Sequence, residues 1–80
     1  MKGWTCLKNI VLQKGLTRVS FYKGIDALGE IRYIITTDTY GAIGSREEVT
    51  KERGNELFSK LVSEGYEKYW ERIQREVKAI

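Results

Sequence analysis

Residues 30–45 read EIRYIITTDTYGAIGS, an alternating strand followed by two closely spaced glycines and a serine. In a strand, one face of this segment carries Ile31, Tyr33 and Ile35, and the other carries an arginine, an isoleucine and a threonine. The outer face of a half-buried strand is normally polar throughout. A face that combines a cation with an apolar side chain therefore raises the question of what it contacts.

Two further strands are expected before this one. Residues 4–13, WTCLKNIVLQ, are rich in strand-favouring residues, and residues 16–23, LTRVSFYK, alternate well. Gly15 lies between them and supplies the positive φ that a two-residue hairpin turn needs. Residues 24–29, GIDALG, are bounded by glycines and are expected to form a loop. With residues 30–40 as the third strand, the pattern predicts an antiparallel meander.

Helical signals begin at Ser45, in the sequence SREE. The Ser45 hydroxyl can accept from the backbone of Glu48 while the Glu48 carboxylate reaches back, which is a capping box. Helical spacing then continues through Leu57, Phe58, Leu61, Val62, Tyr66, Tyr69, Trp70, Ile73, Val77 and Ile80. Gly65 is a candidate break, with glycine in the left-handed conformation that ends many helices. We expect two helices, at 46–63 and 66–79, and one unbroken helix is the alternative.

These elements predict an α+β fold in a single small domain, residues 1–80. A three-stranded antiparallel meander in residues 1–44 packs one face against a helical segment in residues 45–80. The expected core combines apolar residues of the strands with those of the helix: Ile10, Leu12, Val19, Phe21, Ile31, Tyr33 and Ile35 against Val49, Leu57, Phe58, Leu61 and Val62.

Composition argues against several functional classes. The chain has no histidine, and its carboxylates show no paired spacing, so we expect no enzymatic activity, no metal site and no cofactor. No apolar run approaches 18 residues, so we expect no membrane span. The single cysteine, Cys6, cannot form an intrachain disulfide, and the expected location is the cytoplasm.

The placement of charge points to a polyanionic partner. The net charge is +3; residues 1–45 hold six Lys/Arg against three Asp/Glu, whereas residues 46–80 hold eight of each. All of the excess positive charge therefore belongs to the predicted strands. A basic excess on one element is the electrostatic footprint of nucleic-acid binding, although +3 is also an ordinary solubility charge.

The sequence thus predicts a nucleic-acid-binding module that uses the outer face of the sheet, with DNA and RNA both open. Arg18, Tyr22 and Arg32 are the expected central contacts, because cations bind phosphates and flat rings stack on bases. Positions at strand ends or turns supply the expected phosphate neutralisers: Lys8, Lys14 and Lys23.

The alternative is a protein-interaction module: a homodimer, an inhibitor or an adaptor. Its support is an apolar stripe on the C-terminal helix that is wider than a small sheet can cover. The interface would be formed by Tyr66, Tyr69, Trp70, Ile73 and Val77.

Overall fold

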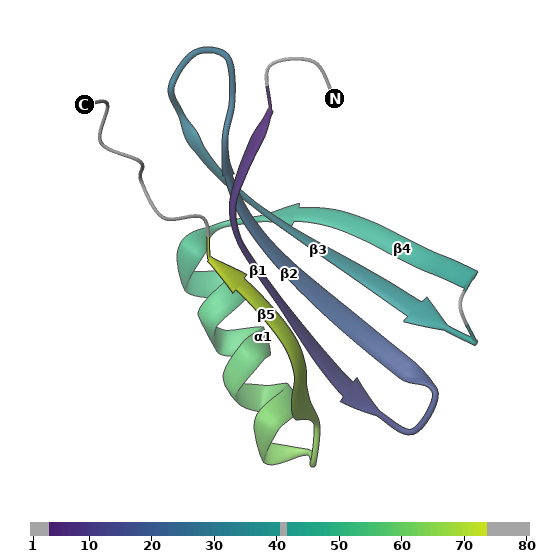
Figure 1. Ribbon diagram of the computed structural model, residues 1–80. Helices are drawn as coiled ribbons and strands as arrows, with labels where there is room; N and C mark the ends of the chain where they lie inside the picture. The colour runs from purple at the N-terminus through teal and green to yellow at the C-terminus, as the bar shows by residue number, and fades with distance from the viewer. Residues whose placement is uncertain (1–3, 41, 74–80) are drawn as a thin grey trace.

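The computed structural model describes residues 4–40 and 42–73, which form one five-stranded antiparallel sheet and one helix (Figure 1). Along the sheet the strands lie in the order β4-β3-β2-β1-β5. Within the described residues, no helix has the length and apolar content that a membrane span requires. The elements in chain order are β1 (Thr5–Lys14), β2 (Thr17–Ile25), β3 (Ile31–Thr39), β4 (Ala42–Val49), α1 (Lys51–Ser63) and β5 (Glu67–Ile73).

The predicted meander of β1, β2 and β3 is confirmed. Lys14 pairs with Thr17 across a two-residue turn in which Gly15 has φ +61°, so the glycine meets the requirement for positive φ. The β2–β3 loop is organised by Asp26, whose carboxylate accepts from the backbone N–H groups of Leu28 and Glu30, both at 2.9 Å. These local bonds fix the register of both hairpins.

The segment predicted to begin the helix is instead β4, which pairs with β3 from Thr39–Ala42 to Tyr33–Val49. Without β4, the backbone groups along the outer side of β3 would remain unpaired. The capping box predicted at Ser45 is therefore wrong. The helix begins after Thr50, whose side-chain oxygen accepts from the Arg53 N–H at 3.1 Å.

The predicted helix break at Gly65 is confirmed, but no second helix follows within the described residues. Gly65 has φ +100°, and the Tyr66 N–H donates to the Leu61 carbonyl at 3.0 Å, which is a Schellman ending. The chain then forms β5, which pairs with β1 from Gln13–Glu67 to Lys8–Ile73. The helical stripe predicted from Tyr66 to Ile73 is therefore wrong, because tyrosine, tryptophan and isoleucine suit a strand equally well. The predicted interface residue Val77 lies outside the described residues.

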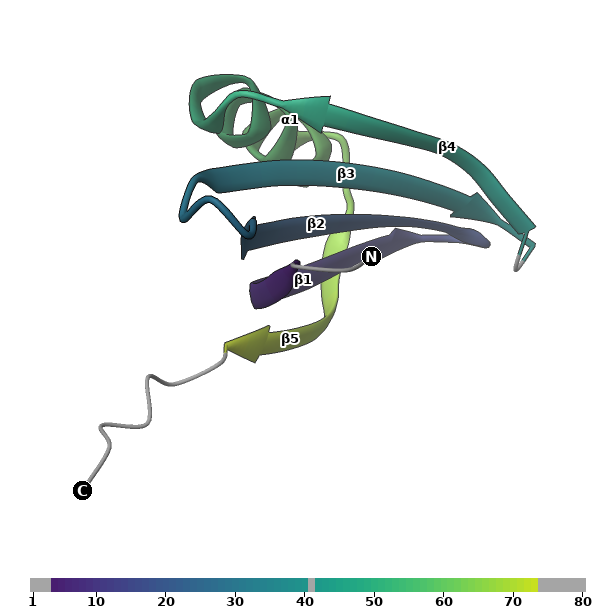
Figure 2. The same cartoon turned by 90° about the horizontal axis from the view of Figure 1, so that it is seen from above.

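The helix crosses one face of the sheet and joins its two edges. Figure 2 shows the chain leaving the end of α1 and passing across the sheet to β5, on the opposite edge from β4. The rings of Phe21 and Phe58 meet edge to face with centroids 5.3 Å apart, and this contact packs α1 against β2.

The predicted core is correct in its centre and wrong at its margins. Leu12, Val19 and Ile35 are buried as expected, and Leu12 is 1% exposed. Ile31 and Val62 remain 44% and 49% exposed, because they lie where the sheet and the helix end. The outward-facing Ile34 is 8% exposed, so it does not present the accessible apolar surface that the sequence suggested.

Candidate anion-binding site

A row of side chains on the helix-facing side of the sheet carries an unusual amount of charge. The antiparallel registers place Lys8 opposite Lys23, Lys23 opposite Tyr33, and Tyr33 opposite Val49. The next row on the same face is apolar at its centre, with Ile10, Phe21 and Ile35, and ends in a glutamate on each edge strand, Glu71 and Glu47. The two lysines therefore occupy positions that continue the core-facing side of β1 and β2.

The helix presents equally unusual residues to this row. Lys51, Gly54, Asn55 and Phe58 follow the i, i+3, i+4, i+7 spacing of a single helix face. Only the last of these is apolar, so the first two turns of α1 bring little hydrophobic volume to the sheet. A hollow of about 300 Å³ remains between α1 and the strands.

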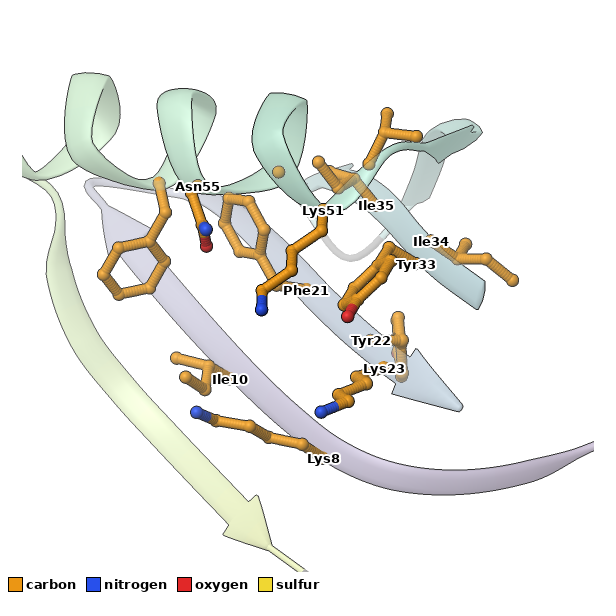
Figure 3. A pocket seen from close by; sticks show the side chains of 13 residues that line it. Lys8, Ile10, Phe21, Tyr22, Lys23, Tyr33, Ile34, Ile35, Lys51 and Asn55 are labelled. Atoms are coloured by element: carbon orange, nitrogen blue, oxygen red, sulfur yellow. The ribbon is translucent and has the colours of Figure 1, made fainter. Parts of the chain in front are cut away.

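Three lysine side chains border this hollow. Figure 3 shows the Lys8 and Lys23 side chains extending from the sheet and Lys51 extending down from the helix, with the three ammonium groups bordering the same space. None of the three forms an ion pair with another residue that the structure describes. Their charges repel one another in a partly enclosed space, so a bound anion would be stabilised there.

The remaining walls are aromatic and aliphatic, with some neutral polar groups among them. Rings are contributed by Phe21, Phe58, Tyr22 and Tyr33. Asn55 contributes an amide from the helix (Figure 3). Neither the Tyr33 hydroxyl nor the Asn55 amide makes a side-chain hydrogen bond to any residue in the described ranges. The hollow thus combines cations, flat rings and available hydrogen-bonding groups, which is the chemistry that recognises a phosphorylated aromatic ligand.

Arg32, a predicted central contact, forms ion pairs with carboxylates in the structure. Its guanidinium lies 2.7 Å from Asp26, 3.0 Å from Glu48 and 3.8 Å from Glu30. The hydrogen bond from Arg32 holds the pKa of Asp26 below its ordinary value of 3.8, and the same contact raises the pKa of Arg32. A phosphate approaching Arg32 would have to compete with three carboxylates that already surround it.

Arg18 and Tyr22 lie on the open face of the sheet by strand register. Tyr22 also contributes to the lining of the hollow, whereas Arg18 does not. The Arg18 guanidinium stacks over the Tyr69 ring, 4.2 Å from its centroid. Asp38 lies directly opposite Arg18 in the β2–β3 register, and Glu67 lies opposite Gln13 in the same row. The open face therefore mixes charges of both signs and lacks the cationic excess of the hollow.

Of the three predicted phosphate neutralisers, two come together and one does not. Lys8 and Lys23 are direct partners across β1 and β2. Lys14 lies at the far end of β1, where its ammonium donates to the Glu64 carbonyl at 2.7 Å and lies 6.0 Å from the centroid of the Tyr66 ring. Lys14 therefore secures the end of the helix and does not reach the hollow.

Sequence reasoning missed Lys51, Tyr33 and Asn55 as candidate site residues. Lys51 and Asn55 could have been found from helical spacing. They lie on the same helix face as the core residue Phe58, and they are polar where that face should be apolar. Tyr33, which the sequence analysis expects in the core, lines the hollow.

Candidate metal ligands are not grouped at the site. Among residues 4–40 and 42–73, no group of three His, Cys, Asp or Glu side chains could hold a metal ion.

Comparisons with protein-family models, curated proteins and solved structures found no match to this chain.

Proposed function

We propose that this chain is a small, non-enzymatic cytoplasmic module that binds nucleic acid, and that it holds phosphate groups in the lysine hollow. The observation that carries the proposal is the convergence of Lys8, Lys23 and Lys51 on one hollow, with no carboxylate paired to any of them among the described residues. A phosphate group supplies the missing negative charge, and phosphate contacts dominate the affinity of proteins for nucleic acid.

The proposal moves the binding surface from the open face of the sheet to the helix-covered face. On the open face Arg32 is already surrounded by carboxylates, and Asp38 lies opposite Arg18. The covered face carries Glu71 and Glu47 at the two ends of the neighbouring row, but among the described residues neither forms an ion pair with a lysine of the hollow. Lys8 and Lys23 keep the role expected from the sequence, and Lys51 joins them.

The proposal is tested by fluorescence-anisotropy titrations of labelled single- and double-stranded DNA and RNA at about 50 mM salt, where phosphate contacts are strong. Lys51→Gln removes one charge from the hollow. Lys60→Gln is the matched control, because Lys60 is an exposed lysine on the same helix and lies outside the hollow.

We expect Lys51→Gln to weaken binding several-fold and Lys60→Gln to leave it nearly unchanged. Equal losses in the two variants would mean that only overall charge matters, which would contradict a localised site. Absence of binding to every nucleic acid at this salt concentration would refute the proposed function altogether.

A second candidate function is association with a protein through β5. Tyr69 and Trp70 are 55% and 45% exposed on this edge strand, and an edge strand offers unpaired backbone groups for strand addition. Sedimentation or light scattering of wild type and Trp70→Glu tests the homodimer form of this proposal. A dimer that the substitution dissociates would support it, and a monomeric wild type would remove it.

A further inference from the structure

We infer that the lysine hollow holds one nucleotide unit, with its base against the aromatic walls and its phosphate among the ammonium groups. The inference rests on the proposed function and specifies its ligand. The unit can come from an unpaired strand or from a free nucleotide, because both present the same phosphorylated base.

The size of the hollow limits what can enter it. Its volume of about 300 Å³ lies at the lower end of the range for small-molecule pockets. In a duplex the bases are stacked inside and only the backbone could touch the mouth of the hollow. An unpaired nucleotide can turn its base away from its neighbours and insert it.

The walls suit a base better than they suit a bare phosphate. Phe21 and Phe58 form an edge-to-face pair in the wall of the hollow. Tyr33 contributes a separate ring from the sheet (Figure 3). Stacking on such rings is largely independent of base identity, because every base has a flat π-face. Inorganic phosphate would satisfy only the lysines.

Two of the neutral polar groups provide contacts that phosphate alone would not use. Asn55 offers two donors and an acceptor, and Tyr33 offers a hydroxyl. Both lie at the hollow and make no side-chain hydrogen bond within the described residues. Base edges carry complementary donors and acceptors, so these groups can orient the inserted base.

The first test compares adenosine 5′-monophosphate, adenosine and inorganic phosphate by NMR titration of the full chain. We expect the monophosphate to bind at least about tenfold more tightly than either adenosine or phosphate, since stacking and charge neutralisation act together. The shifted resonances should include Tyr33, Gly54 and Asn55. Equal affinities for monophosphate and inorganic phosphate would overturn the inference and leave a simple anion site.

The second test blocks the hollow without removing a charge. A Cβ at Gly54 would lie 3.7 Å from Val49 Cγ2, an ordinary contact, so Gly54→Ala is a tolerated control. Gly54→Leu keeps a good helix former and extends a larger side chain from the wall of the hollow. We expect the leucine variant to lose at least about tenfold in monophosphate affinity and the alanine variant to retain most of it. Equal retention in both variants would overturn the inference.

If Gly54→Leu does not fold, Tyr33→Leu provides the same information by removing a ring from the wall. It should weaken the monophosphate about tenfold and leave inorganic phosphate unchanged. Loss of both ligands to the same degree would contradict stacking.

A labelled single strand and a blunt duplex of the same length then separate this inference from the proposed function. Tighter binding of the single strand supports both. Equal binding of the two, with sensitivity to Lys51→Gln, keeps nucleic-acid binding and overturns the nucleotide inference. Binding of the free monophosphate without binding of either polymer keeps the nucleotide site and refutes the proposed function.

Discussion

At the scale of single residues, the pairing of Lys8 with Lys23 is the feature that most needs a functional explanation. Like charges directly opposite each other in an antiparallel pair destabilise a sheet. No carboxylate is paired to either lysine among the described residues to offset the repulsion. Residues that cost stability are commonly retained where a ligand uses them.

Replacing one of these lysines should therefore stabilise the free protein. We predict that Lys8→Thr raises the free energy of unfolding in urea by about 0.5 kcal/mol, because threonine favours strands and the repulsion disappears. The double variant Lys8→Thr/Lys23→Thr should gain less than the sum of the two single variants, since the repulsion can be removed only once. A loss of stability in both single variants would contradict this interpretation.

The Asp26–Arg32 contact makes stability depend on pH in a defined direction. The hydrogen bond from Arg32, together with the backbone donors of Glu30 and Leu28, lowers the folded-state pKa of Asp26 below 3.8. The stabilisation is therefore present above the unfolded-state pKa and is lost as the pH falls through the lower folded-state value.

We predict that the urea midpoint of wild type falls between about pH 5 and pH 2, and that Asp26→Asn shows a smaller fall over the same range. The asparagine side chain cannot titrate, so the part of the pH dependence that Asp26 supplies disappears. Identical pH profiles for the two proteins would show that Asp26 is not stabilised in its charged form.

The alternation of the strand residues predicts which face of the sheet carries Lys8 and Lys23. Lys23 continues the series Val19, Phe21, and Lys8 belongs to the same series as Ile10 and Leu12. Both series point toward the core, so both lysines could have been assigned to the covered face. By their positions at strand ends or turns both are instead expected as peripheral charges, and a lysine at a core-facing position is uncommon.

At the scale of elements, local signals predicted the first three strands and failed at the last two. Hairpin turns are local, so Gly15 and the Asp26 loop were readable from sequence. The formation of β4 and β5 depends on unpaired edges of β3 and β1, which no short window of sequence contains. Tertiary pairing therefore overrode both the predicted cap at Ser45 and the helical spacing of the aromatic residues.

The true start of α1 can be tested directly against the one predicted from sequence. We predict that Thr50→Ala lowers the free energy of unfolding by about 1 kcal/mol, because the Arg53 N–H loses its acceptor. Ser45→Ala should change it by less than about 0.5 kcal/mol, since Ser45 is exposed on an edge strand. The reverse order of effects would favour a helix that begins at Ser45.

At the scale of the whole molecule, the crossover of α1 from one sheet edge to the other creates the candidate site. β4 and β5 occupy opposite edges, so the helix between them must cross the sheet (Figure 2). This path brings Lys51 over Lys8 and Lys23, which are far from it in sequence. The α+β class was predictable from composition and pattern, but the meeting of these three lysines depends on the edge pairing that the sequence pattern did not reveal.

The most direct test of the central claim is the salt dependence of single-strand binding for wild type and for Lys8→Gln/Lys23→Gln/Lys51→Gln. If the three lysines together neutralise the one phosphate that the hollow holds, log K against log salt should be less steep in the triple variant by about 0.7. That result would assign the phosphate contacts to the lysine hollow. An unchanged slope, with wild-type binding intact, would show that the nucleic acid contacts another surface and would contradict the account.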